Sequence, residues 1–170
     1  MSSIATTLGL HANGLTPVPC QAPYHAIFNF MFAYVFLSSR LLKNSYGIDH
    51  NVNPREDITR FGEKAVHDGK ITRQQLNMLK RNEAAHANAM EHFPVFIGST
   101  LFAIVSQVPN VTINRVCTIY SAARVVYAMA YLSVENVRFS YIRSLAWWIS
   151  NFSCIYLLWK SGQALNAGMV

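Results

Sequence analysis

The sequence predicts an all-α integral membrane protein, a bundle of four transmembrane helices. Its composition carries this prediction: 52% of the 170 residues are hydrophobic and only 13% are charged, against about a quarter in ordinary soluble domains. Four stretches are nearly free of Asp, Glu, Lys and Arg, and each approaches the roughly 20 residues that cross the hydrocarbon core of a bilayer. Residues 1–170 are therefore expected to form a single membrane domain.

The four helices are expected at about 24–43, 72–108, 111–134 and 139–161. At the end of the first helix, Arg40 and Lys43 can extend their charged groups toward the lipid head groups. The second helix is expected to begin at Thr72, because Thr72 is followed three residues later by Gln75, a capping-box pattern. Its first turns therefore precede the apolar span and are expected in the cytosol. Pro94 is expected to kink this long helix without ending it.

The charge distribution predicts the orientation in the membrane. Nine of the 14 Lys and Arg residues lie within 40–81, whereas only Arg115 and Lys160 lie on the opposite side of the predicted spans. Cationic loops remain in the cytosol. We therefore expect the loop 44–71 to be cytosolic and both termini to be luminal, with the endoplasmic reticulum as the expected membrane. Because most of the positive charge lies on one side of the predicted spans, the net charge of +6 does not indicate a nucleic-acid partner.

The cysteines do not indicate whether disulfides form, and no metal site is expected. The three cysteines are odd in number, and Cys117 and Cys154 fall inside predicted spans, where small buried hydrophobic roles suit them. The spacing of His86, Glu91 and His92 does not match a known metal-binding motif.

A polar stripe enters the apolar part of the second helix. At about 100° per residue, Arg81, Asn88 and His92 lie close to one line along the helix, with Glu91 to one side. Exposure to solvent accounts for Arg81 and Asn88. It accounts less well for Glu91 and His92, because ionisable groups beside an apolar span are costly unless they face a bundle interior or a partner. We therefore favour a functional role for the stripe.

The third helix carries Arg124, Tyr127 and Tyr131 on one face. An arginine this deep in a span requires an anionic partner, and Glu91 is the best candidate in the membrane. The sequence thus predicts a structural ion pair between Glu91 and Arg124. An interfacial aromatic belt is an alternative explanation for Tyr131, as snorkelling is for Arg138.

Two motifs carry a resemblance to a known family. The first, in the second helix, comprises Arg81, Ala85-His86, Asn88, Glu91 and Pro94-x-Phe96. The second comprises Arg124-x-x-Tyr127-x-x-x-Tyr131 and, seven residues later, Arg138; this is the spacing of leukotriene-C synthases. With both motifs in order in a four-span chain, residues 24–162 resemble the MAPEG family, the membrane-associated proteins in eicosanoid and glutathione metabolism. The long loop before the second helix is similar to that of fungal members.

The resemblance implies a homotrimer that binds glutathione as co-substrate, in a cytosol-facing pocket between neighbouring protomers, with no metal. A lipophilic electrophile would arrive from the bilayer. The expected glutathione-binding residues are Arg81, Asn88, Glu91, His92, Tyr127 and Arg143. Glutathione has two carboxylates and an ammonium group, which suit Arg, Asn and Glu side chains through charge-assisted hydrogen bonds.

The expected catalytic residues follow from the glutathione thiol, which is mostly protonated at neutral pH because its pKa is about 8.5. Arg138 is expected to stabilise the thiolate, since arginine keeps its charge. Tyr131 is expected to bond to the sulfur or to protonate the product oxygen. Arg143, followed by Ser144, is similar to an Arg-Ser pair in the prostaglandin E synthase and is a second candidate for the catalytic cation.

Three positions depart from the family's better-known members. Ala84 and Ala87 stand where glutathione-binding relatives have arginine, and His92 replaces a tyrosine. Each lost carboxylate partner is expected to weaken glutathione binding by about 1.5 to 3 kcal/mol, and His92 is a possible replacement.

The departures leave three functions open. The main hypothesis is a glutathione-dependent transferase or peroxidase. The first alternative is a glutathione-independent isomerase or cyclase that uses Glu91, His92 and Tyr131 as acid and base. The second is a non-catalytic lipid-presenting protein, which would need no thiolate-stabilising pair; the presence of Arg138 with Tyr131 favours an enzyme.

Overall fold

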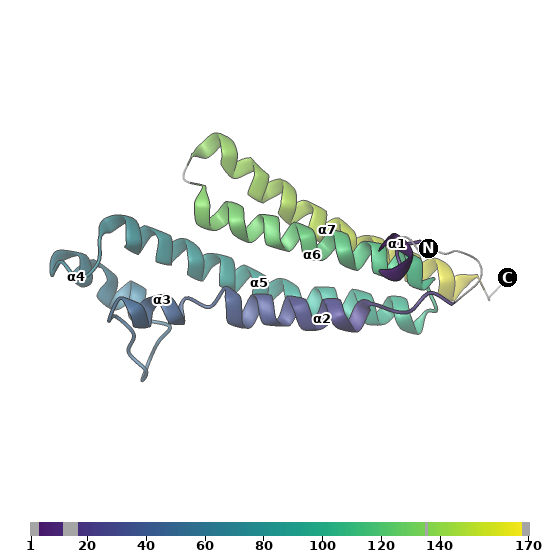
Figure 1. Cartoon of the computed structure of the whole chain (residues 1–170), viewed down its shortest axis with the longest axis horizontal. Coiled ribbons are helices and arrows are strands. Elements are labelled where there is room, and N and C mark those ends of the chain that lie inside the picture. Colours follow the sequence, from purple (N-terminus) through teal and green to yellow (C-terminus); the bar gives the residue numbers. More distant parts are fainter. Residues whose placement is uncertain (1–3, 12–16, 135, 168–170) are drawn as a thin grey trace.

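Four long helical segments form an elongated bundle in the computed structural model, which describes residues 4–11, 17–134 and 136–167 and, for 137–139, the backbone alone (Figure 1). They are α2 (Ala22–Met31) with the π-helix η1 (Phe32–Phe36), α5 (Arg73–Val105), α6 (Asn110–Ser133) and α7 (Val137–Asn166). α6 packs against α7, both pack against α5, and α2 lies against α5 and α6. The shorter elements are α1 (Ile4–Thr7), α3 (Arg40–Ser45), η2 (Asp57–Phe61) and α4 (Gly62–His67).

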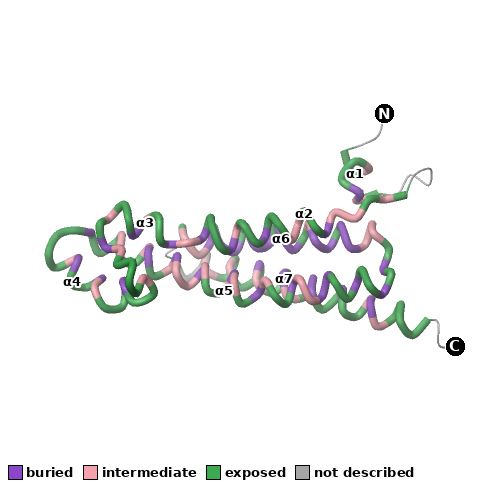
Figure 2. The backbone as a smooth tube through the Cα atoms, turned by 90° about the horizontal axis from the view of Figure 1, so that it is seen from below, coloured by how far each residue is buried: buried purple, intermediate pink, exposed green. Residues whose placement is uncertain are grey.

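Buried residues lie on the faces that the long helices turn toward one another (Figure 2). The exposed residues of the long helices include many large hydrophobic side chains. On α7, Tyr141, Leu145 and Phe152 are 71%, 63% and 59% exposed. Within the described residues, two helical segments are long and apolar enough to cross a membrane, Ala22–Ser45 and Asn110–Ser133. With 33 and 30 residues, α5 and α7 are also long enough to cross a bilayer. That these two helices span the membrane stays a prediction.

α5 begins at the predicted capping box. Thr72 Oγ1 accepts a hydrogen bond from the Gln75 amide (3.2 Å), and Gln75 Oε1 accepts one from the Thr72 amide (2.7 Å). This pair satisfies two of the backbone N–H groups that a helix start leaves without partners. The helix then continues through Pro94 to Val105. One helix thus extends from the polar residues near Thr72 into the apolar bundle.

The first predicted helix, 24–43, is not continuous: η1 ends at Phe36, and α3 begins at Arg40. Side chains of α5 bind backbone carbonyls on this segment. Asn82 Nδ2 donates to the Leu37 carbonyl at 3.0 Å, and His86 Nδ1 donates to the Ala33 carbonyl at 2.7 Å. The break is therefore stabilised by α5, because buried carbonyls need hydrogen-bond donors.

Residues 40–80 form a small extension at one end of the bundle, with a hydrophobic cluster of its own that includes Ile48, Ile58 and Leu76. Glu63 on α4 links this extension to α5, accepting hydrogen bonds from Arg73 (2.6 Å) and Lys80 (3.1 Å). The hydrogen bonds from Arg73 and Lys80 hold the pKa of the exposed Glu63 carboxyl below its ordinary value. This link therefore persists at neutral pH and is lost only as the pH falls through that lowered pKa.

At the opposite end, Asn114 fixes the N-terminal segment to α6. Its fully buried side chain accepts a hydrogen bond from the Gln21 amide (2.8 Å) and donates to the carbonyls of Gly9 (3.1 Å) and Pro19 (2.8 Å). Cys117, one turn further along α6, is fully buried, as its predicted hydrophobic role requires.

Candidate functional site

Four of the predicted site residues form a continuous stack on α6 and α7. The guanidinium of Arg124 lies 4.6 Å from the ring centre of Tyr127. The Tyr127 and Tyr131 rings meet edge to face with their centres 5.6 Å apart, and the guanidinium of Arg143 lies 4.5 Å from the Tyr131 ring centre. Such cation–aromatic contacts gain strength where water is excluded, and Arg124 is only 3% exposed. We call these four residues the cation–aromatic stack.

Asn88 joins the stack from α5. Arg124 Nη2 donates a hydrogen bond to Asn88 Oδ1 at 2.9 Å. Arg81, two turns before Asn88, donates through Nη2 to the Leu132 carbonyl at 3.4 Å, so its positive charge lies at the carboxyl end of α6, where the helix dipole favours a cation. α5, α6 and α7 therefore each contribute predicted site residues to the same end of the bundle.

The predicted ion pair between Glu91 and Arg124 is wrong for a single subunit. Glu91 is exposed, and within the described residues it forms no ion pair with Arg124, which bonds to Asn88 instead. The reason is helical geometry: Glu91 is turned about 60° from Asn88 around α5. The amide of Asn88 and the ring of Tyr127 are thus the neighbours that offset the buried charge of Arg124.

This geometry gives an expectation for Glu91→Gln. Because the carboxylate has no ionic partner within the described residues of its subunit, the substitution is expected to change the free energy of unfolding by less than about 0.5 kcal/mol. Asn88→Ala, which removes a hydrogen bond to a buried charge, is expected to cost about 1.5 to 3 kcal/mol. Thermal unfolding in detergent compares the two. A loss for Glu91→Gln as large as that for Asn88→Ala would show that a neighbouring subunit supplies the partner.

His92 lies in the core rather than with Glu91. It is 7% exposed, and its Nδ1 is 3.0 Å from the hydroxyl of Tyr120. The Tyr120 ring stacks on Phe96 with a centre distance of 4.1 Å. The structure therefore does not bring His92 to the exposed face of α5. Arg138 lies in the first turn of α7, and its side chain is outside the described residues.

A cleft of about 510 Å³ opens beside Glu91, between α5, the break in the first helix and the extension. Its lining is rich in charged and polar groups: Ser38, Ser39, Arg40, Lys43, Pro54, Arg55, Glu83, His86, Ala87, Met90 and Glu91. Sequence reasoning did not identify Arg40, Lys43 or Arg55 as site residues. The basic composition of the extension was the only available signal, and it indicates orientation rather than contacts.

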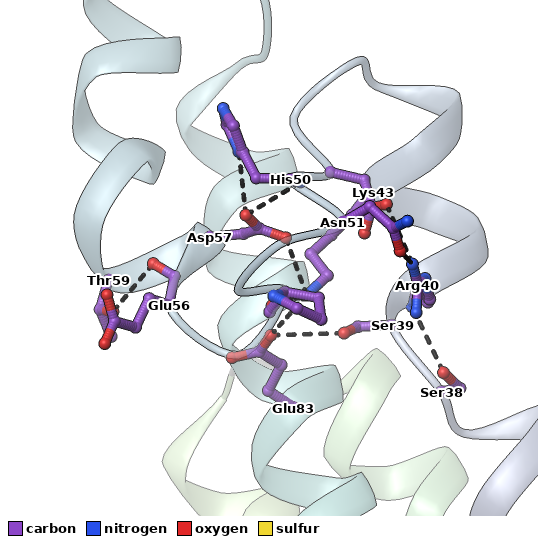
Figure 3. A network of polar contacts seen from close by, with 12 residues as sticks. Ser38, Ser39, Arg40, Lys43, His50, Asn51, Glu56, Asp57, Thr59 and Glu83 are labelled. Carbon is purple, nitrogen blue, oxygen red and sulfur yellow. Dashed lines mark hydrogen bonds and ion pairs between the residues drawn. The ribbon is translucent and has the colours of Figure 1, made fainter.

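One wall of the cleft is held by a buried cluster of charges (Figure 3). Lys43 is 3% exposed, and its Nζ lies 3.4 Å from Asp57 Oδ2 and 3.3 Å from Glu83 Oε1. The same Nζ donates a hydrogen bond to the Pro54 carbonyl. Asp57, fully buried, also accepts from the backbone amide (3.1 Å) and Nδ1 (2.9 Å) of His50. The expectation that Lys43 extends toward the head groups is thus wrong, because these acceptors hold it inside.

The described residues contain no group of three His, Cys, Asp or Glu side chains able to hold a metal ion. The stack and the cleft bring guanidinium, carboxylate, amide and phenol groups to one end of the bundle. These features describe an all-helical membrane protein with a polar site at one end of its bundle.

The model of the MAPEG family matches residues 24–162, and the chain belongs to that family. Membership implies a membrane protein with a glutathione-related function of transferase, synthase or isomerase type. No match was found among curated proteins or among solved structures.

Proposed function

We propose that this protein is a glutathione-dependent membrane transferase or peroxidase that activates the glutathione thiolate against a lipophilic electrophile. The cation–aromatic stack is the observation that carries the proposal. It places Arg143 against the Tyr131 ring at 4.5 Å, so a permanent cation lies beside a phenol that can donate a proton. The attack of a thiolate on an oxygen-bearing electrophile needs both groups: a cation that stabilises the thiolate and a proton donor for the product oxygen.

Glutathione binding is assigned to the end of the bundle where the stack and the cleft lie. Arg81 and Asn88 offer donors for carboxylates, and the exposed Glu91 offers an acceptor for the ammonium group. We propose that the protein is a homotrimer in which a neighbouring subunit completes this site. The proposed location is the endoplasmic reticulum membrane, with the extension in the cytosol, where glutathione is available, and both termini in the lumen.

The proposed reaction begins with loss of the thiol proton to solvent, as the guanidinium of Arg138 or Arg143 stabilises the thiolate. The thiolate attacks an electrophilic carbon, for example of an epoxide, so that an S–C bond forms and a C–O bond breaks. The electron pair remains on the oxygen, which takes a proton from the Tyr131 hydroxyl. Tyr131 then regains its proton from water. The apolar surface of α7 gives the second substrate a route from the bilayer.

The test is a titration of the detergent-purified protein with glutathione while the ultraviolet absorbance of the thiolate is recorded. Wild type is expected to bind glutathione and to show thiolate at neutral pH. Arg138→Ala is expected to bind with less thiolate, because a cation beside the sulfur is lost. Absence of glutathione binding to wild type at millimolar concentration would contradict the proposal and favour the isomerase or the lipid-presenting protein.

A further inference from the structure

The cleft contains two side chains of opposite charge that have no ionic or hydrogen-bonded partner among the described residues, Arg55 and Glu91. Both are exposed. They do not form an ion pair with each other, so their charged groups are more than 4.0 Å apart. Because both side chains line the same cleft, a ligand that carries an anionic and a cationic group and reaches across the cleft can contact the two at once.

The other charged side chains of the cleft are already engaged. Arg40 pairs with Asp49 at 3.7 Å and donates a hydrogen bond to Asn51 Oδ1. Lys43 and Glu83 contact each other at 3.3 Å. Arg55 is thus the cation of this cleft that is available to a carboxylate.

The buried cluster around Lys43 holds the backbone next to Arg55 (Figure 3). Lys43 Nζ binds the Pro54 carbonyl, which belongs to the peptide group that joins Pro54 to Arg55. Two residues after Arg55, Asp57 is fixed by His50 and by Lys43 itself. A residue anchored on both sides presents its side chain to a ligand at a smaller entropic cost than one in a free loop.

We propose that Arg55 binds a carboxylate of glutathione, while Glu91 binds the ammonium group of the same molecule. The inference rests on the proposed function. It adds Arg55, a residue of the extension, as a group that positions glutathione in the cleft. Ala87, which also lines the cleft, brings no charge, so the carboxylate depends on a cation from elsewhere in the chain. The 510 Å³ cleft is large enough for a ligand of small-molecule size.

The test compares Arg55→Gln with Arg60→Gln in the full-length protein in detergent, with glutathione affinity measured by calorimetry. Arg60 is a matched control, because it lies in the same extension, is 69% exposed and pairs with Glu56 outside the cleft. Arg55→Gln is expected to raise the Kd for glutathione about tenfold or more, since it removes a charge-assisted bond. Arg60→Gln is expected to leave the Kd unchanged.

A second ligand identifies the carboxylate. γ-Glutamylcysteine lacks the glycine carboxylate of glutathione. If Arg55 binds that group, Arg55→Gln lowers the affinity for glutathione only; if it binds the glutamyl carboxylate, both affinities fall. Equal glutathione affinity in wild type and Arg55→Gln would overturn the inference and leave the proposed function standing. Failure of wild type to bind glutathione would overturn the proposed function itself.

Discussion

Lys43→Met is expected to unfold the extension at residues 40–80 while the helical bundle persists. The substitution leaves the fully buried carboxylate of Asp57 with only the His50 ring and amide as partners, and it removes the donor to the Pro54 carbonyl. Removing one partner of a buried ion pair costs about 3 to 5 kcal/mol. That is a large loss for a segment whose hydrophobic cluster is small. Hydrogen exchange measured by mass spectrometry is expected to show increased exchange in 44–71 and unchanged protection in α6.

Lys64→Met provides the control, because Lys64 is an exposed residue of α4 in the same extension. It is expected to alter stability by no more than about 0.5 kcal/mol. Equal protection of the extension in both variants would show that the hydrophobic cluster, and not the buried charges, holds it in place.

Arg143→Leu is expected to lower the kcat of glutathione conjugation by about 10² to 10³, the range measured when one preorganised electrostatic contact to a reacting group is lost. The guanidinium stacks on Tyr131, so its loss removes a cation from beside the proposed proton donor. Arg143→Lys is expected to restore little activity, because an ammonium group lacks the planar face that stacks on a ring. Steady-state rates at saturating glutathione separate this effect on kcat from an effect on binding.

Lys160→Leu is the matched control on the same helix. Lys160 Nζ lies 5.2 Å from the Trp159 ring centre, so the variant also removes a cation–aromatic contact, but at the far end of α7. Its kcat is expected to equal that of wild type. Wild-type kcat in Arg143→Leu would exclude Arg143 as the catalytic cation and leave Arg138.

Local patterns predicted the features that depend on a single helix. The Thr72 and Gln75 spacing predicted the capping box, since both side chains act within one turn. The i, i+3 and i+7 spacing of Arg124, Tyr127 and Tyr131 placed them on one face, where the structure stacks them. Family membership was likewise predicted from motif spacing and is confirmed over 24–162.

Features that depend on contacts between distant segments could not be predicted. Lys43 looked like an interfacial residue because its partner Glu83 lies 40 residues away. The choice of Asn88 over Glu91 as the partner of Arg124 depends on the rotation of α5 relative to α6, which the sequence does not give. Arg55 could not be predicted as a ligand-binding residue, because it lines the cleft only through the packing of the loop 44–71 against α5.

The hydrogen bonds of Asn114 impose an order on how the chain matures as it is synthesised. Gln21 is made 93 residues before Asn114, and Gly9 is made 105 residues before it. Until α6 has been inserted beside α2, the carbonyls and amide that Asn114 binds have no such partner. Gly9, Pro19 and Gln21 can therefore gain these hydrogen bonds only after α6 has been synthesised, long after they have been made themselves. The contacts that hold Gly9, Pro19 and Gln21 against α6 are thus formed late, although these residues are made before every transmembrane helix.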